Sequence, residues 1–266
     1  MKSPRLTPRL TFCVAALALN LAGCGSSPIS DKDSPEKLYA DARDEMASGS
    51  YDKAIKLLER VEGRAAGTLL AQQAQLDQAY AQWKSGERAT ALATLDRFIK
   101  VHPSSPALDY AMYLKGIVNF NDNLGIFSSI SRQDVSERDQ QASRDAYQAF
   151  KQLVDQFPDS KYSADARVRM DYIVNALASY EVHVARYYFR RGAFLAAANR
   201  AQNTVRDYQQ TPAVEEALYI LAQSYDRLGL NDLRDDADRV LKHNYPDSRF
   251  LREGMRKPDN PWWKFW

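Results

Sequence analysis

Small residues recur along this chain at fixed distances, and that regularity constrains the fold more than any other feature of the sequence. Gly49 and Gly86 lie 37 residues apart, and Gly192 and Gly229 repeat the same interval. An alanine stands seven positions before each of these glycines: Ala42, Ala79, Ala185 and Ala222. Small side chains let two antiparallel helices approach closely, and glycine accepts the positive φ of a tight turn. The pattern therefore predicts a series of helix-turn-helix units.

The interval between successive units indicates which repeat this is. Pro212 and Pro246 lie 34 residues apart, and 34 residues is the period of the tetratricopeptide repeat (TPR). A proline ends the second helix of a unit because it cannot continue a helix. No stretch alternates apolar and polar residues as a strand would. We expect an all-α TPR solenoid of about five repeats over residues 35–250, in which stacked units bury a continuous core.

The third repeat departs from the regular spacing. Gly116 stands in its small-residue position, and the answering Ala146 follows 30 residues later instead of 12. The difference predicts an insertion at about residues 121–139. Its apolar residues either dock a partner or fold back onto the repeats; they are Leu124, Ile126, Phe127 and Ile130. From about Tyr162 we expect a helix longer than one repeat requires.

The N-terminus carries a targeting signal. Three basic residues precede an apolar run of 13 residues from Leu10 to Ala22, which is too short to span a bilayer. Residues 1–23 therefore read as a secretory signal peptide. The sequence Leu-Ala-Gly-Cys that ends at Cys24 resembles the lipobox of bacterial lipoproteins, in which the cysteine is acylated before cleavage. We expect lipidation at Cys24, a flexible tether over residues 24–34, and, because Gly25 rather than Asp follows, sorting to the outer membrane.

The first helices of TPR units line the concave face of the array with their fifth, ninth and twelfth positions. In the first three units these positions supply the candidate residues of a peptide groove: Tyr39, Arg43, Leu76, Tyr80, Trp83, Tyr113, Ile117 and Phe120. Aromatic rings give large contact area at low entropy cost, so the expected ligand is an extended peptide with apolar or aromatic side chains. The alternative is that these rings pack as core between neighbouring helices.

The composition offers little to catalysis or metal binding. A formal charge of +2 is not the strong positive charge that is typical of proteins that bind nucleic acid. The chain has 3 His and 2 Cys, and no metalloprotease, phosphate-loop or nucleophile-elbow motif is present. His183 lies on an expected helix without a second ligand four residues later, which favours a structural role. We expect no enzymatic activity, no cofactor and no metal.

The tail over residues 251–266 is rich in tryptophan. Its last residues read Pro-Trp-Trp-Lys-Phe-Trp. Such residues suit a membrane interface or the groove of a partner, and they are equally compatible with a disordered end.

Several stretches, in order along the chain, carry a resemblance to a known family. They are Leu95–Lys100, Asp109–Gly116, Ser136–Asp139, Ala146–Phe150, Val184–Tyr188 and Asn199–Arg200. Over about residues 20–250 the chain resembles the BamD (ComL) family, lipoproteins of the β-barrel assembly machinery. The family's Tyr-Pro-Phe-Gly after the first repeat is replaced here by Arg-Ala-Ala-Gly at 64–67, and the tail beyond about residue 254 matches nothing in the family.

The resemblance implies a function and partners. Such proteins bind the barrel-forming BamA through its membrane-proximal POTRA domain, contact smaller lipoproteins of the complex and are implicated in recognising the C-terminal signals of unfolded outer-membrane proteins. Arg200 matches the arginine that pairs with an acidic residue of the POTRA domain. We therefore expect a non-enzymatic, lipid-anchored adaptor at the periplasmic face of the outer membrane. The alternatives are a TPR lipoprotein that coordinates peptidoglycan or cell-division enzymes, and an enzyme subunit.

Overall fold

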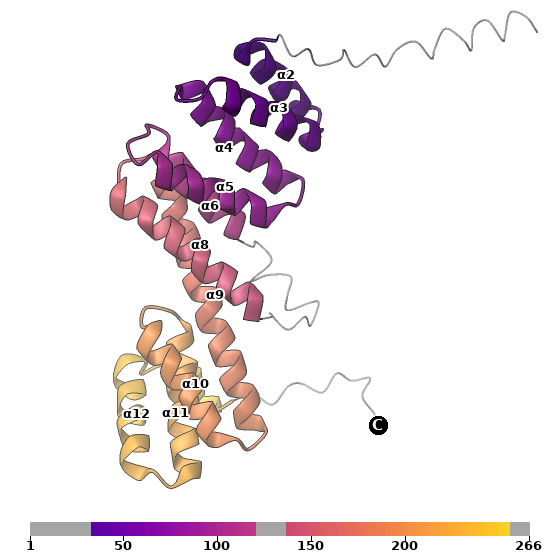
Figure 1. The fold of residues 1–266 in the computed structure, drawn as a ribbon. Coiled ribbons are helices and arrows are strands. Elements are labelled where there is room, and N and C mark those ends of the chain that lie inside the picture. Colours follow the sequence, from indigo (N-terminus) through magenta and orange to yellow (C-terminus); the bar gives the residue numbers. More distant parts are fainter. Residues whose placement is uncertain (1–32, 121–136, 256–266) are drawn as a thin grey trace, which may run out of the picture. The chain divides into compact units, whose positions relative to one another are not determined.

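Figure 1 shows the fold in a computed structural model, which describes residues 33–120 and 137–255. Within these ranges all regular structure is helical, in successive helix-turn-helix pairs. The helices are α2 (Pro35–Ala47), α3 (Tyr51–Arg64), α4 (Leu69–Lys84), α5 (Arg88–Val101), α6 (Leu108–Asn119), α8 (Glu137–Gln156), α9 (Ser163–Arg190), α10 (Phe194–Asp207), α11 (Ala213–Leu228), α12 (Asn231–Asn244) and α13 (Arg249–Glu253). The predicted all-α TPR fold is confirmed.

The turns between paired helices form as the glycine spacing predicts. Gly229, for example, follows α11 with φ of 71° and ψ of 18°, a left-handed conformation. Its N–H donates to the carbonyl of Asp226, and the N–H of Leu230 donates to the carbonyl of Tyr225. These two bonds satisfy carbonyls that the helix end would otherwise leave open. The four alanines of the repeat are at most 3% exposed, so they do permit close helix packing: Ala42, Ala79, Ala185 and Ala222.

The chain divides into two compact units after Ala74. In the first unit, α2 and α3 pack around Leu38 and Leu58, both fully buried. The Oγ of Ser34 caps α2 by accepting from the N–H of Lys37 at 3.3 Å. Residues before Asp33, which include Cys24, lie outside the described residues.

In the second unit, the third repeat shows the closest helix approach. A Cβ built on Gly116 of α6 would lie 2.3 Å from Cε1 of Phe150 on α8, and Phe150 is fully buried. Even an alanine would therefore collide with the ring. Helix α8 begins at Glu137, two residues before the expected end of the insertion. The four apolar residues expected on the insertion fall within 121–136, outside the described residues.

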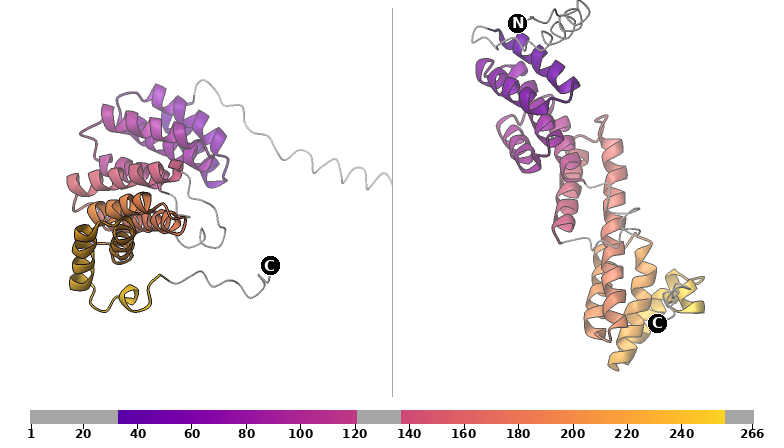
Figure 2. Two further views of the ribbon diagram at one scale, coloured as in Figure 1. Left: turned by 90° about the horizontal axis from the view of Figure 1, so that it is seen from below. Right: turned by 90° about the vertical axis from the view of Figure 1, so that its right-hand side faces the viewer.

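Helix α9 joins the two halves of the second unit. It runs for 28 residues without a glycine or proline to interrupt it. Its N-terminal part packs beside α8, and its C-terminal part packs beside α10 and α11 (Figures 1 and 2). The long helix expected from about Tyr162 is thus a single continuous helix, and it positions residues in both halves.

The second helix of the last repeat, α12, buries few side chains. Among the α12 side chains only Ala237 and Leu241 are buried, and Arg234 forms an ion pair with Asp226 at 3.2 Å instead of entering the core. Beyond it, α13 crosses the boundary expected at residue 250. Its Phe250 is 7% exposed, so the helical array extends slightly past the expected start of the tail. Residues 256–266 lie outside the described residues.

Candidate partner-binding surfaces

Five aromatic side chains meet where α6 adjoins α9, and we call them the aromatic cluster: Tyr110, Tyr113, Phe120, Tyr162 and Tyr172. The rings of Tyr113 and Tyr162 stack with centroids 4.8 Å apart. Tyr110 lies 5.5 Å from Tyr162, and Phe120 meets Tyr172 edge-on at 5.7 Å. Offset and edge-to-face contacts at these distances are favourable for aromatic rings. The fully buried Phe150 ring joins the two groups, with its centroid 6.1 Å from that of Tyr113 and 6.2 Å from that of Phe120. All five side chains of the cluster are half-buried, so the cluster presents ring surface.

A charged pair fixes the edge of the aromatic cluster. The hydroxyl of Tyr113 donates to Oδ2 of Asp165 at 2.7 Å, and Nε of Arg169 donates to the same oxygen at 2.6 Å. Burial alone would raise the pKa of the Asp165 carboxyl, but the hydrogen bonds from Arg169 and Tyr113 outweigh burial and lower it. The Arg169 guanidinium also lies over the ring of Phe120, 4.8 Å from its centroid.

Two further predicted groove residues lie on α4. Tyr80 and Trp83 meet edge-on at 5.8 Å, and the Lys84 ammonium lies 4.1 Å from the Trp83 ring centroid. Burial raises the pKa of Tyr110 to about 12, and nearby acidic groups that include Asp77 and Tyr80 add to the rise. Tyr80, Trp83 and Tyr110 pack against the same buried core, which places the two α4 residues near the aromatic cluster.

The remaining predicted groove residues fare differently. Leu76 is fully buried in the core with Ala79, where no ligand could contact it, so it leaves the candidate set. Ile117 is half-buried and packs against the core of the third repeat. Tyr39 and Arg43 belong to the first compact unit, where Tyr39 packs against the core and Arg43 is exposed.

Ion pairs dominate the other half of the second unit, and we call the four residues that form two of them the ion-pair cluster: Glu181, Arg186, Arg200 and Glu216. Arg186 donates two hydrogen bonds of 2.6 Å to the carboxylate of Glu216. Nη1 of Arg200 donates to both carboxylate oxygens of Glu181 at 3.2 Å. The Glu181 side chain is only 10% exposed, whereas that of Arg200 is 42% exposed. A buried carboxylate requires such a partner, so Arg200 serves the fold as well as any ligand.

The geometry of Arg200 leaves it able to contact a second carboxylate. A guanidinium has five N–H donors in a planar fork. Both contacts to Glu181 use Nη1, and neither Nε nor Nη2 makes a hydrogen bond to a described residue. Sequence reasoning missed Glu181 as the internal partner of Arg200.

Sequence reasoning also missed the α9 contribution to the aromatic cluster. Tyr162 and Tyr172 lie outside the positions that a standard unit directs to its concave face, because α9 is longer than a standard first helix. The Asp165–Arg169 spacing of four residues was the available signal, since it places both side chains on one helix face.

Neither metal nor membrane geometry is evident in the described part of the chain. Across residues 33–120 and 137–255, no group of three or more His, Cys, Asp or Glu side chains is placed to hold a metal ion. No described helix combines the length and apolar character that crossing a bilayer would require.

The fold and these surfaces define a TPR protein that presents ring-rich and charged faces from paired helices. The chain belongs to the YfiO family of outer membrane lipoproteins, whose family model matches residues 31–241. It is 48% identical to the outer membrane protein assembly factor BamD of Neisseria meningitidis serogroup B, over 94% of this chain and 97% of that protein. The factor of the same name from Vibrio cholerae is 34% identical, over 86% of this chain and 95% of that protein.

Solved structures of other repeat proteins also align. TPR-like repeats of a putative kinesin light chain from Podosopora anserina match with 15% identity and a TM-score of 0.34, over 80% of this chain and 96% of that chain. The crystal structure of MamA protein matches with 16% identity and a TM-score of 0.33, over 84% of this chain and 97% of that chain.

Proposed function

We propose that this chain is an assembly factor for outer-membrane proteins, acting as a non-enzymatic adaptor that is lipid-anchored at the periplasmic face of the outer membrane. The observation that carries the proposal is the 48% identity with the Neisseria meningitidis assembly factor over nearly the whole of both chains. The decisive experiment is affinity purification from detergent-solubilised outer membrane with mass spectrometry. Co-purified BamA and smaller lipoproteins of the complex are expected; recovery of a peptidoglycan synthase instead would overturn the proposal.

The anchor is acylated Cys24. Several acyl chains hold a protein stably on a bilayer, whereas one chain binds only weakly. Cys24→Ser is expected to abolish incorporation of a fatty-acid analogue and to remove the protein from the outer-membrane fraction. Label retained on the Cys24→Ser protein would exclude this anchor.

The aromatic cluster, together with Tyr80 and Trp83, is the proposed contact for the C-terminal signal of an unfolded outer-membrane protein. Its rings match a terminal aromatic side chain in chemistry, and Arg169 places a guanidinium beside them. A barrel-derived peptide that ends in an aromatic residue should crosslink to probes at Tyr80, Trp83 or Tyr113. Probes at Gln223 and Asp226, in the last repeat, serve as controls. Equal labelling at both ends would count against this contact.

Arg200 is the proposed contact for an acidic residue of the BamA POTRA domain. Glu181 accepts hydrogen bonds from Nη1 of Arg200, and the exposed remainder of the guanidinium would donate to a second carboxylate. Because Arg200→Glu would also repel Glu181, the binding test uses the double variant Arg200→Glu/Glu181→Gln, which removes that internal repulsion.

BamA should co-purify with the double variant at greatly reduced yield, since loss of one partner of a desolvated charge pair costs about 2–5 kcal/mol. Arg206→Glu reverses an exposed charge on the same helix and is the matched control. Wild-type yield from the double variant would show that Arg200 does not contact BamA.

A further inference from the structure

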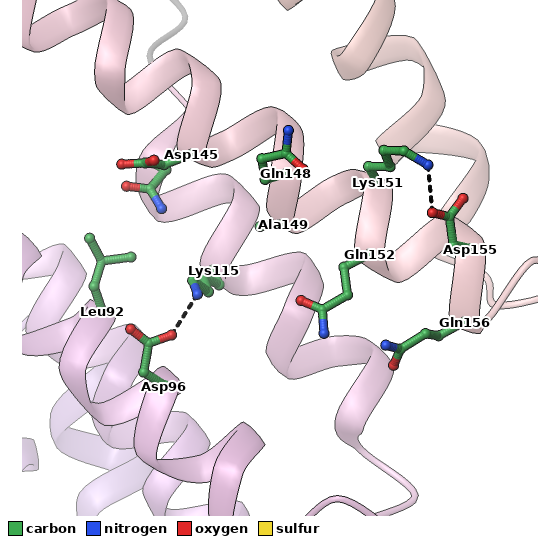
Figure 3. Close-up of a pocket in the computed structure, with 11 residues that line it drawn as sticks. Leu92, Asp96, Lys115, Asp145, Gln148, Ala149, Lys151, Gln152, Asp155 and Gln156 are labelled. Atoms are coloured by element: carbon green, nitrogen blue, oxygen red, sulfur yellow. Dashed lines mark hydrogen bonds and ion pairs between the residues drawn. The ribbon is translucent and has the colours of Figure 1, made fainter.

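A polar groove lies in the second unit, apart from both clusters described above. It encloses about 580 Å³ and is lined by α5, α6 and α8. Figure 3 shows α8 along one side, α5 along the other and α6 between them. The lining residues include Asp96 from α5, Lys115 from α6 and three glutamines spaced four residues apart on α8, which are Gln148, Gln152 and Gln156. No tyrosine, tryptophan or phenylalanine is among them, so the groove is chemically unlike the aromatic cluster.

Gln152 and Gln156, the last two of these glutamines along α8, form a short ladder of amides. They extend from α8 into the space beside α6 (Figure 3). Neither makes a hydrogen bond to a residue that the structure describes, and both are exposed. Residues four apart on a helix are separated by about 6 Å along its axis. Every second residue of an extended chain recurs at about 6.6–6.8 Å, so the two amides are spaced to meet alternate residues of an extended polypeptide.

A primary amide is also the right chemical match for such a chain. It carries an acceptor oxygen and a donor nitrogen side by side. Every second residue of an extended strand presents its N–H and C=O toward the same edge, as strands do when they add to a sheet. Each glutamine could therefore pair with the main chain of one residue, whatever its side chain.

The charges that line the groove favour a basic ligand over an acidic one. Asp96 and Lys115 form an ion pair of 2.6 Å, and Lys151 and Asp155 form a second ion pair of 2.6 Å, which leaves Asp145 of α8 as an additional carboxylate (Figure 3). Asp145 accepts one hydrogen bond, from the neutral amide of Gln141 at 2.9 Å. Extra negative charge disfavours an anionic ligand and favours a lysine or arginine side chain. The absence of a ring among the lining residues removes the stacking platform that a sugar ring or base would use.

We propose that the groove between α5 and α8 binds an extended polypeptide segment through its main chain, with Gln152 and Gln156 pairing to alternate residues and a basic side chain of the segment beside Asp145. This site goes beyond the proposed function: it is distinct from the aromatic cluster and from Arg200, and its failure would leave the adaptor role untouched.

The test uses the full chain in detergent and a synthetic nonapeptide of alternating lysine and threonine, acetylated and amidated at its ends. Binding is measured by fluorescence anisotropy at physiological salt. The peptide should bind, and Gln152→Ala/Gln156→Ala should weaken binding at least tenfold. Gln202→Ala, which truncates an exposed glutamine on α10, is the matched control and should leave the dissociation constant unchanged.

Main-chain recognition is tested with the same peptide N-methylated at every second residue. Two such peptides, methylated in alternate registers, remove the donors of one edge or the other while leaving side chains and charge intact. At least one should bind tenfold more weakly than the parent. Binding of both methylated peptides as tight as that of the parent, an unchanged dissociation constant for the double glutamine variant, or no binding of the parent peptide at millimolar concentration would each overturn the proposal.

Discussion

The aromatic cluster and the ion-pair cluster both depend on α9, yet they are held together by different forces. In the aromatic cluster, rings from α6, α9 and the residues next to them make stacked, tilted and edge-on contacts at 4.8–5.7 Å, and a shared carboxylate bonds to one edge. In the ion-pair cluster, a carboxylate that is nearly buried depends on one half-exposed arginine. Ring packing spreads its stabilisation over many weak contacts, whereas a buried charge concentrates it in one partner. The two surfaces should therefore respond to mutation in different ways.

The largest effect is expected at Arg200. Removing one partner of a buried ion pair costs about 3–5 kcal/mol, and the partial exposure of Arg200 reduces this to about 2–4 kcal/mol for Arg200→Glu. The variant places two carboxylates together in α9 and α10. Urea unfolding followed by circular dichroism measures the loss.

The companion variant separates repulsion from lost packing. Arg200→Glu/Glu181→Gln removes the second carboxylate and should recover at least about 1 kcal/mol of the loss, because neighbouring sites are not additive. A double variant no more stable than Arg200→Glu would show that the Glu181 contact contributes little.

The core packing next to the aromatic cluster is tested at Gly116, because its neighbour Phe150 contacts both Tyr113 and Phe120. Gly116→Ala drives a methyl group into the buried Phe150 ring, at 2.3 Å from Cε1 before relaxation. Overpacking of this kind costs about 1–3 kcal/mol. The same change at Gly63, on α3, meets nothing within 4 Å and should stabilise the helix by up to about 1 kcal/mol. Opposite signs for the two variants in thermal unfolding confirm the close approach; matching signs would contradict it.

These two regions also show how far the sequence could predict the structure. The alanine and glycine spacing located the paired helices because close approach of two helices leaves room only for small residues, as Ala79 and Gly116 demonstrate. Position rules for a standard unit placed Leu76 toward a ligand, but its side chain enters the core. They could not place Tyr162, because α9 exceeds the standard length, nor pair Glu181 with Arg200 across two helices. Contacts between helices depend on packing angles that spacing along the chain does not specify.

A smaller effect is expected at the edge of the aromatic cluster. Tyr113→Phe keeps the ring stack with Tyr162 and removes the hydrogen bond to Asp165. The expected loss is about 0.5–1.5 kcal/mol, toward the lower end because Arg169 still bonds the carboxylate. Tyr187→Phe serves as the control, because the Tyr187 side chain is exposed and its hydroxyl makes no hydrogen bond to a described residue. This variant should change the free energy of unfolding by about zero.

The same loss carries a pH dependence that the control lacks. Hydrogen bonds from Arg169 and Tyr113 lower the pKa of Asp165 below its unfolded value. This contribution is therefore present above the unfolded pKa of about 4 and disappears as pH falls through the folded value. The cost of Tyr113→Phe should accordingly shrink below about pH 4.

The smallest effect is expected at Tyr110, whose contribution to stability should fall at alkaline pH. Burial raises the pKa of Tyr110 to about 12, whereas an unfolded tyrosine titrates near 10. Between pH 10 and 12 the unfolded chain loses this proton first, so the stability that neutral Tyr110 contributes is present below pH 10 and is lost as pH rises toward 12. Tyr110→Phe has no proton to lose and should flatten the decline, by about 1 kcal/mol at most once the partial exposure of the ring is allowed for.

At pH 7 the variant should match the wild type, because no hydrogen bond from the Tyr110 hydroxyl to a described residue is present. Urea unfolding at pH 7, 10 and 11.5 measures the difference, and an equal decline in both proteins would show that Tyr110 is not shielded from water as its neighbours indicate.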